Sequence, residues 1–508
     1  VHGVFSFKCG VSGLVQISQL RLTERLQQRI FAKSSFEFAV RIPRIKLEAI
    51  QNRYAPEMVN QFFDTVTLQK TISKLLVDYP TASLQVFFGL ILISIYHPFF
   101  LIFSLGVVLL LYIVFRLSGP RGVKTSVRES TSKYEVAHWL EELARTMGTF
   151  KLAGVTNLPL VRVDQLILSY LGFRRKHFSI LLTQYKVMVA FKVVVIITLL
   201  VMGSLLLIDN EISIGQFVAA EIVIILIMNS IEKLILGLET VYDMLTSLEK
   251  LGGVTDMPLE SEKANAPVSL PSQRGFDIEV DHLKFQYPGT NRKVVNELSF
   301  RLKPGQKVAL CGPPGSGKST LLQLLTGLYE NYDGRIAYNG FSLNSLRHDL
   351  LRLEIGDNIW QENIFKGSVR ENLTMGKPEI TDEQALEALH ICGVREEMAM
   401  LDQGLDTELF PGGVKLPRTL ARKLILARSV LGEIRLLLLD LETDMLKQYQ
   451  KEEFYDFFFE QSFTSIVATR DEALMERADA VWYLQRGRLM FDGDYNTFKN
   501  SEYAESIR

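Results

Sequence analysis

Long apolar runs dominate the first half of the chain. Residues 84–115, LQVFFGLILISIYHPFFLIFSLGVVLLLYIVF, contain no Asp, Glu, Lys or Arg. The run is too long for one buried helix, and the His97-Pro98 step in its middle predicts a tight turn. A second apolar pair, 187–208 and 214–238, is joined by the short link DNEIS. Four runs of near-bilayer length are rare in soluble cores, so we predict four membrane spans over 79–96, 98–116, 187–208 and 214–238.

The first residues continue this pattern. Residues 1–18 are moderately apolar and lead into RLTERLQQRIF, a basic amphipathic sequence. They resemble the cytoplasmic end of a spanning helix, and no signal peptide pattern precedes them. We therefore interpret 1–18 as a partial span, expect the sequence to be truncated at its N-terminus, and predict a transmembrane domain over 1–250.

The loops predict an orientation in the membrane. Segment 116–186 carries 12 Lys and Arg against five Asp and Glu, whereas the two short links carry no Lys or Arg. The positive-inside rule places this segment in the cytoplasm, where its composition predicts long helical extensions. Inside the apolar runs, Lys192 can snorkel from the cytoplasmic end. Glu221 either marks a functional site, faces a water-filled cavity or pairs with a neighbouring helix.

The pattern changes in the second half. Residues 251–275 are rich in Pro, Ser, Gly and charged residues, as is typical of a linker. From residue 276 apolar and polar positions alternate, as in FDIEVDHLKFQYP and LSFRLKPGQKVALCG, which predicts strands. We expect 276–508 to form a separate domain.

A phosphate-binding loop is the strongest motif of this half. GPPGSGKST at 312–320 fits G-x-x-x-x-G-K-[ST] and lies between strand-like KVAL and helix-like TLLQLLTGL. Glycines allow backbone N–H groups to wrap phosphates, and the helix N-terminus adds a positive dipole. We expect Lys318 to reach the β- and γ-phosphates and Ser319 to bind Mg²⁺. The predicted loop consists of Gly312, Pro313, Pro314, Gly315, Ser316, Gly317, Lys318, Ser319 and Thr320.

An acidic partner for the magnesium ion follows the loop. The run LLLLD at 436–440 predicts a buried strand that ends in an acid. This pattern places Asp440 beside the metal ion.

Composition excludes several other functions. The 508 residues carry a net charge of −1, with 56 basic and 57 acidic side chains, which argues against a nucleic-acid-binding protein. The three cysteines, Cys9, Cys311 and Cys392, form no CxxC pair. A disulfide framework and a cysteine-rich zinc site are therefore excluded.

Together, the membrane hairpins and the P-loop domain resemble an ABC exporter half-transporter. The resemblance covers the whole chain and implies an α-helical membrane domain, with four complete helices and part of a fifth, fused to an α/β P-loop ABC ATPase domain. It implies ATP and Mg²⁺ as ligands. Tyr287 of FQYP would stack on adenine, and Gln361 of QENIFKGSVRENL would sense the γ-phosphate and join Ser319 and Asp440 at the metal.

The same resemblance implies further architecture. Such exporters have six spanning helices per half, so the first helix and part of the second are expected to be absent here. Residues near 43–49 and 152–160 are expected to form the two coupling helices that touch nucleotide-binding domains. The pattern is also similar to bacterial exporters of peptides or proteins that work with periplasmic adaptor proteins.

The chain departs from this family at its signature motif. Where the family has LSGGQ, this chain has Leu416, Pro417, Arg418, Thr419 and Leu420, and the following ARKLILARS fixes the register. Pro417 suits the first position of a helix. Arg418 and Thr419 are candidate replacement contacts, against the alternative that Arg418 is simply solvated.

The hydrolytic residues depart as well. Leu441 stands where the resemblance implies a catalytic glutamate, and Glu442 lies one position late. Thr469 stands at the position of the switch histidine, and Lys447 at that of the D-loop aspartate. We therefore assign no catalytic residue, although Glu442 stays a candidate base.

Two functions remain open at this point. The first is an ATP-binding exporter subunit with weak or absent hydrolysis, paired as a homodimer or as a heterodimer with another ABC half-transporter. It would lie in membrane lipid, in a bacterial inner membrane, with its nucleotide-binding domain in the cytoplasm. The second is an ATP-binding regulatory or scaffold membrane protein that does not transport. A P-loop kinase fused to an anchor is disfavoured, because the features after the P-loop follow the ABC order.

Overall fold

A computed structural model describes residues 2–50, 55–260, 274–359, 364–441 and 446–507. The chain forms two compact units. The helical unit comprises Val1–Ile45 and Arg53–Pro258, and the α/β unit comprises Lys46–Asn52 and Leu259–Arg508. Each unit is described by itself below.

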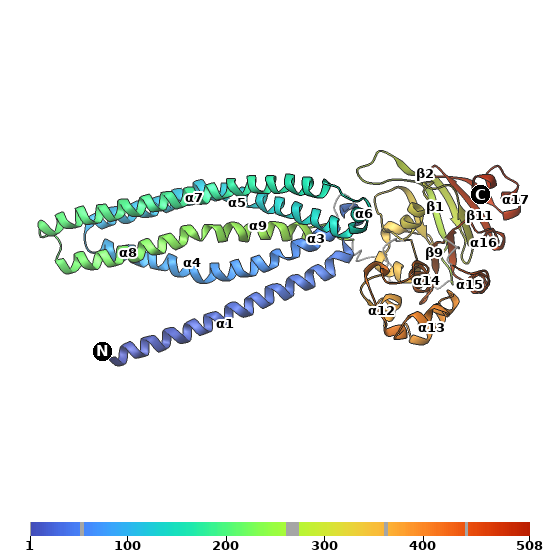
Figure 1. Ribbon diagram of the computed structural model, residues 1–508, viewed down its shortest axis with the longest axis horizontal. Coiled ribbons are helices and arrows are strands. Elements are labelled where there is room, and N and C mark those ends of the chain that lie inside the picture. The colour runs from blue at the N-terminus through green and yellow to red at the C-terminus, as the bar shows by residue number, and fades with distance from the viewer. Residues whose placement is uncertain (1, 51–54, 261–273, 360–363, 442–445, 508) are drawn as a thin grey trace. The chain divides into compact units, whose positions relative to one another are not determined.

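The helical unit is built from long helices, several of which lie side by side (Figure 1), while α1 diverges from the others toward its N-terminal end. Its elements are α1 (His2–Arg41), η1 (Ile42–Arg44), α3 (Ala55–Phe62), α4 (Asp64–Ser94), α5 (Pro98–Arg145), α6 (Met147–Leu152), α7 (Leu158–Ile208), α8 (Ile214–Leu236) and α9 (Leu238–Thr255). The continuous α1 joins the expected partial span at 1–18 to the basic sequence that follows it.

The ends of these helices match the predicted turns. His97 begins α5, where its Nδ1 accepts a hydrogen bond from the Phe99 N–H, and Pro98 occupies the first turn. Ser213 begins α8 through a capping box with Gln216. Four helical stretches among the described residues are long and apolar enough to cross a membrane, by length and composition. Three of the predicted spans lie in them, and the first, 79–96, extends two residues past Ser94. The helices α5 and α7 continue far beyond their apolar segments, as predicted.

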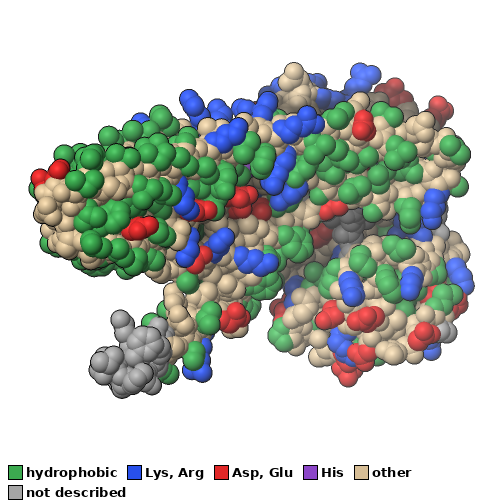
Figure 2. All heavy atoms as spheres, turned by 60° about the vertical axis from the view of Figure 1, so that its left-hand side comes forward, with side chains coloured by type: hydrophobic (Ala, Val, Ile, Leu, Met, Phe, Trp, Pro, Cys, Tyr) green, Lys and Arg blue, Asp and Glu red, His purple; other side chains and the backbone are tan. Residues whose placement is uncertain are grey.

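The apolar segments supply the surface and the core of this unit. On the face shown in Figure 2, hydrophobic side chains gather over one end of the helical bundle, while Lys and Arg lie over other parts of it. Buried residues from α4, α5, α7 and α8 form a common core, with Ile93, Phe100 and Ala220 almost fully enclosed. The bundle thus buries one stripe of each helix and presents the rest of its apolar surface outward, as expected for helices in lipid.

Three expectations about this unit can be compared with the structure. Lys192 Nζ lies 3.2 Å from Oε2 of Glu232 on α8, and its expected snorkelling stays a prediction. Glu221 is half-buried and makes no hydrogen bond or ion pair with another described residue. The helix α9 continues to Thr255, so the first five residues of the expected linker 251–275 are helical; residues 261–273 lie outside the described part.

The short helix nearest to the expected second coupling helix does not cover the expected residues. The short helix is α6 at Met147–Leu152, and residues 153–157 are not helical. Gly154 has φ +73°, a left-handed conformation that ends a helix, and Pro159 stands in the first turn of α7. The expectation of a coupling helix near 152–160 is therefore wrong for residues 153–157, whereas Leu152 ends α6 and Leu158 begins α7.

The α/β unit contains three sheets in its described part. The six-stranded sheet has the order β12-β11-β3-β10-β9-β6, and only β12 runs antiparallel to its neighbour. The four-stranded antiparallel sheet has the order β2-β1-β4-β5, and β7 pairs with β8. The strands are β1 (Ile278–Gln286), β2 (Lys293–Leu302), β3 (Lys307–Cys311), β4 (Asp333–Tyr338), β5 (Phe341–Ser342), β6 (Ile355–Asp357), β7 (Gly367–Ser368), β8 (Glu408–Leu409), β9 (Leu436–Asp440), β10 (Thr464–Ala468), β11 (Ala480–Gln485) and β12 (Arg488–Gly493).

Helices and two apolar cores complete this unit. Its helices are α2 (Leu47–Ile50), α10 (Lys318–Leu325), α11 (His348–Leu351), α12 (Val369–Thr374), α13 (Asp382–Ile391), α14 (Arg418–Ser429), α15 (Gln448–Glu460), α16 (Glu472–Arg477) and α17 (Tyr495–Lys499). One core packs α10 against both large sheets, and the other packs α12 to α15 against the six-stranded sheet. The strands predicted around 276–288 and 298–312 are present as β1, β2 and β3.

Candidate functional site

The P-loop joins β3 to α10 at the carboxyl edge of the parallel strands. Gly312 has φ +146°, and a Cβ at this position would lie 2.1 Å from the Leu484 carbonyl oxygen. Gly317 has φ +106°, and its Cβ would lie 2.8 Å from the Val294 carbonyl oxygen. These two positions therefore require glycine. The loop delivers the chain directly into α10, whose first N–H groups have no partner within the helix.

Lys318 is folded back over this loop. Its Nζ donates to the carbonyl oxygens of Gly312, at 2.8 Å, and Pro313, at 3.1 Å, and lies 3.4 Å from the Ser316 hydroxyl. Burial lowers the pKa of Lys318, and the nearby charge of Asp440 acts in the opposite direction. A polyphosphate bound in the loop would favour the charged form of this amine. The site therefore suits an anionic ligand.

Ser319 and Asp440 meet as the sequence predicts. The Ser319 hydroxyl donates to Asp440 Oδ2 at 3.0 Å. Residues Leu436 to Leu439 of β9 are fully buried, and Asp440 emerges at the exposed end of the strand. One hydroxyl and one carboxylate match a Mg²⁺ ion that takes its other ligands from phosphate and water. No cluster of three or more His, Cys, Asp or Glu that could hold a metal occurs among the described residues.

Asn358 holds Asp440 in place and was not singled out from the sequence. Its Oδ1 accepts from the Asp440 N–H at 2.7 Å, and its Nδ2 donates to the Asp440 carbonyl oxygen at 3.2 Å. The side chain thus extends the pairing of β6 with β9 past the end of β6. Its position directly after a buried strand is the sequence feature that could have identified Asn358.

Tyr287 lies beside the start of α10. Its hydroxyl lies 2.9 Å from Thr320 Oγ1 and donates to Gln323 Oε1 at 3.3 Å. Its ring meets Phe285 and Tyr329 edge-on, at centroid distances of 5.1 and 5.6 Å. The structure therefore brings Tyr287 to the P-loop, as the sequence suggested.

Leu441 and Thr469 face away from the open edge. Leu441 is 3% exposed and belongs to the apolar core beneath the sheet. Thr469 is 5% exposed, and its hydroxyl accepts a hydrogen bond from the Asp471 N–H at 3.0 Å. Neither side chain can accept a proton from an attacking water molecule.

The altered signature lies at the start of α14. Pro417 is the N-cap residue, one position before the expected first helical position. This shift follows from its ψ of 136°, which is extended. Arg418 and Thr419 are exposed on the first turn, whereas Leu420 is fully buried. Leu416 is half-buried against the neighbouring apolar core.

Three further sequence predictions concern segments at the margin of the site. Gln361 and Glu442 lie in 360–363 and 442–445, outside the described residues. Lys447 is the N-cap residue of α15, and its Nζ lies 2.5 Å from Glu396 Oε2.

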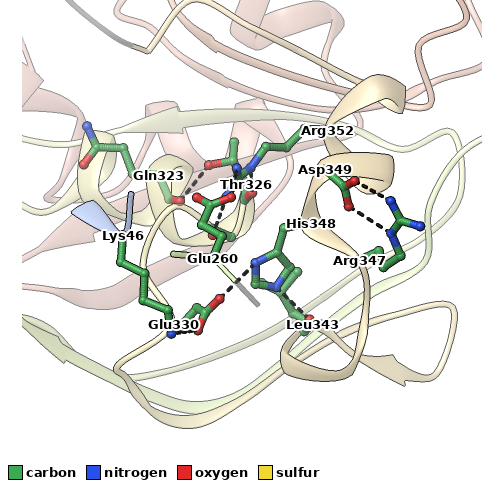
Figure 3. A network of polar contacts seen from close by, with 11 residues as sticks. Lys46, Glu260, Gln323, Thr326, Glu330, Leu343, Arg347, His348, Asp349 and Arg352 are labelled. Carbon is green, nitrogen blue, oxygen red and sulfur yellow. Dashed lines mark hydrogen bonds and ion pairs between the residues drawn. The ribbon is translucent and has the colours of Figure 1, made fainter. Parts of the chain in front are cut away.

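The segment at 46–50 contacts the region beyond α10, as Figure 3 shows. Lys46 Nζ lies 2.6 Å from Glu330 Oε2. Glu48 Oε1 accepts from the Glu330 N–H at 2.7 Å. In the same network Arg352 donates to the carbonyl oxygens of Thr326 and Gly327, at the C-terminal end of α10, and pairs with Glu260 at 2.7 Å. The expected coupling segment near 43–49 thus lies at the opposite end of α10 from the P-loop.

A separate polar cavity of about 90 Å³ lies in the helical unit, away from the apolar segments. Arg174 pairs with Glu129 at 2.8 Å across α7 and α5, and Tyr134 of α5 donates to Asp64 of α4 at 2.7 Å. These contacts hold together charged segments of three helices; the sequence predicted those of α5 and α7 as helical and made no prediction for that of α4.

Comparison with known proteins agrees with this architecture. Residues 295–443 match the ABC transporter family model. The chain is 27% identical, over 311 residues, to a β-(1→2)glucan export ATP-binding/permease protein, NdvA, of Bartonella bacilliformis, covering 60% of this chain and 52% of that protein. It is 29% identical to the α-hemolysin translocation ATP-binding protein HlyB of Escherichia coli O157:H7, covering 62% and 44%. The chain thus spans about half the length of these relatives.

A solved structure extends the likeness to nearly the whole chain. It is that of a bacterial Atm1-family ABC exporter with ATP bound, with a TM-score of 0.82. The alignment covers 97% of this chain and 85% of the other at 18% identity, so it shows a common fold. The four helical stretches that are apolar and long enough to cross a membrane, together with the exporter relatives, indicate an integral membrane protein.

Proposed function

We propose that this chain, an ABC exporter half-transporter by its domains and fold, is the ATP-binding subunit of an exporter that retains ATP binding and hydrolyses ATP weakly or not at all. In this proposal the P-loop residues 312–320, Tyr287 and Gln361 bind ATP. Ser319, Gln361 and Asp440 hold Mg²⁺. The ion would shield the phosphate charges.

The observation that carries the binding half of the proposal is the Ser319–Asp440 contact. It brings a hydroxyl and a carboxylate together at the N-terminus of α10, next to Lys318. The helix N-terminus and the lysine attract phosphates, and the two oxygen atoms suit the accompanying ion.

The hydrolysis half rests on Leu441 and Thr469. Hydrolysis requires a group that positions or deprotonates water near the γ-phosphate. Leu441 is an alkyl chain in the core, and the Thr469 hydroxyl is engaged by backbone. ATP therefore acts mainly as a ligand that closes the partner domains on one another.

The proposal includes a partner, a place and a cargo. Exporters of this fold pair two nucleotide-binding domains, so the partner is a second copy or another ABC half-transporter. The proposed location is the bacterial inner membrane, with the α/β unit in the cytoplasm. The name of HlyB, an α-hemolysin translocation protein, supports a peptide or protein cargo. A periplasmic adaptor protein is a further partner in this proposal.

Purified protein in lipid vesicles tests this proposal. We expect Mg²⁺-dependent ATP binding by the chain alone and negligible phosphate release. The Lys318→Ala variant should lose binding, whereas the matched variant Lys499→Ala, on the exposed surface of α17, should keep it. Rapid turnover that Lys318→Ala abolishes would contradict the hydrolysis half and make Glu442 the next residue to mutate.

An ATP-binding regulatory or scaffold protein that does not transport is the second candidate. The buried Leu441 favours it, because a pump without turnover needs a partner that hydrolyses ATP. Transport assays in vesicles, with and without a conventional half-transporter, separate the two. Cargo movement that depends on Lys318 of this chain supports the exporter subunit.

A further inference from the structure

Arg470 occupies a place at the open edge of the six-stranded sheet that the sequence did not single out. It follows β10, which lies between β3 and β9. Ala468 pairs with Leu310 on one side and with Asp440 on the other. The Thr469 N–H continues this pairing by donating to the Leu310 carbonyl oxygen at 3.1 Å. The chain therefore reaches Arg470 between the strand that enters the P-loop and the strand that ends in Asp440.

The residues on both sides of Arg470 are fixed by their own contacts. Thr469 is buried, and its hydroxyl accepts from the Asp471 N–H. Asp471 caps α16 by accepting from the N–H groups of Ala473 and Leu474, and it pairs with Lys451 at 2.9 Å. Both neighbours are thus held in the protein, and the chain between them presents Arg470.

Arg470 itself is exposed and uncommitted. No hydrogen bond or ion pair connects its side chain to another residue in the described part of the chain. Other arginines in this unit do have carboxylate partners: Arg352 and Arg435 contact carboxylates at 2.7 and 2.9 Å. An arginine without such a partner, at the edge where the P-loop and Asp440 meet, is available to a ligand.

The charges at this edge are not balanced. Lys318 interacts electrostatically with both Arg470 and Asp440, so two cations and one carboxylate lie around the loop. An ATP molecule with its metal ion would bring additional negative charge and relieve the repulsion between the cations.

We propose that Arg470 binds the terminal phosphate of ATP held in the P-loop. The proposal rests on ATP binding at the P-loop, as set out above. A guanidinium group donates two parallel hydrogen bonds to phosphate oxygens. It stays protonated in proteins, so it stabilises the γ-phosphate and accepts no proton from water. Arg470 is in this view a nucleotide-binding residue, and the site distinguishes ATP from ADP without hydrolysing it.

Equilibrium binding of Mg-ATP and Mg-ADP to the full chain in lipid vesicles tests this assignment. We expect Arg470→Gln to weaken ATP binding about tenfold, the effect of losing a hydrogen bond to a charged group, and to leave ADP binding within about twofold. Arg470→Lys should recover part of the ATP affinity, because the charge remains while the two-pronged geometry is lost. The matched control is Arg301→Gln, on the exposed surface of β2.

Each other outcome overturns a distinct statement. Equal losses of ATP and ADP binding in Arg470→Gln would show a structural role, and unchanged ATP binding would show no role; both overturn the assignment. If the wild-type chain binds neither nucleotide more tightly than Lys318→Ala does, the proposed function fails first, and the assignment of Arg470 falls with it.

Discussion

Two parts of one sheet edge differ in the side chains that they present for ATP binding and for ATP hydrolysis. At β3 and α10 the P-loop keeps its glycines, its lysine and the contact between Ser319 and Asp440. One and two strands away, Thr469 and Leu441 turn into the protein instead of toward the ligand. Binding requires backbone N–H groups and fixed charges, whereas hydrolysis requires a group that handles a proton. In the proposed function separate residues carry the two tasks, so hydrolysis can be lost while binding is kept.

The largest effect is expected when Leu441 is replaced by the glutamate that the resemblance implies at this position. Leu441→Glu would put a carboxylate where 3% of the side chain is exposed, so we expect a loss of about 2–4 kcal/mol in stability and no gain in turnover. Thermal unfolding of the full chain in detergent measures this, with Leu441→Met as the volume-matched control. A stable Leu441→Glu variant that hydrolyses ATP would mean that position 441 reaches the nucleotide.

The sequence predicted the binding half of this edge well. A glycine-rich loop between a strand and a helix is a local motif, and four leucines before Asp440 mark a buried strand; both patterns determine where the side chains lie. The four membrane spans could also be predicted, because the length of each apolar run matches the thickness of a bilayer.

Other features depend on contacts that no local pattern records. The contact of Lys46 with Glu330 joins residues 284 positions apart, and Asn358 reaches Asp440 across a strand end. Gly154 and Pro159 separate α6 from α7, so α6 ends before most of the segment 152–160 that the resemblance alone had suggested as a helix. The inward orientation of Thr469 likewise follows from the Asp471 backbone, which a substitution pattern does not show.

Removing the proposed magnesium ligand on α10 tests the binding half of this comparison. Ser319→Ala keeps the loop but deletes the hydroxyl that contacts Asp440. We expect Mg-ATP to bind about tenfold more weakly, whereas ATP in the presence of a chelator binds equally to variant and wild type. Titration with and without Mg²⁺ measures both, with the exposed Ser345→Ala as the control. An equal loss under both conditions would assign Ser319 to the loop's shape and not to the ion.

Lys307, at the end of β3 away from the P-loop, allows the stability of the fold to be changed without changing ATP binding. Lys307 is 4% exposed, and burial lowers its pKa to about 7 from an ordinary value of 10.5. Between these values the unfolded chain binds a proton that the folded chain does not, so this residue makes stability rise with pH from about 7 to 10.5. The slope is on the order of 1 kcal/mol per pH unit.

We expect Lys307→Met to flatten this pH dependence and to leave ATP affinity unchanged. Thermal unfolding at several pH values measures the first effect, and nucleotide titration the second. Lys303→Met changes an exposed lysine of the preceding turn and should preserve the wild-type slope. If Lys307→Met weakens ATP binding as much as it changes stability, the two properties are not separable along β3.

The smallest effect is expected at the far end of α10. Lys46 and Glu330 are both partly buried, with side chains 27% and 19% exposed. Such a pair contributes about 1 kcal/mol.

Lys46→Glu places a second carboxylate beside Glu330 and should lower the unfolding temperature, and adding Glu330→Lys should restore most of it. The pair Arg301–Asp277, whose arginine side chain is 59% exposed, should show a smaller coupling energy when treated in the same way. Because α10 carries the P-loop at its other end, ATP binding should raise the unfolding temperature of the reversed pair as much as that of the wild type. A single reversal with no effect would show that the backbone contacts of Glu48, and not the ion pair, hold this segment in place.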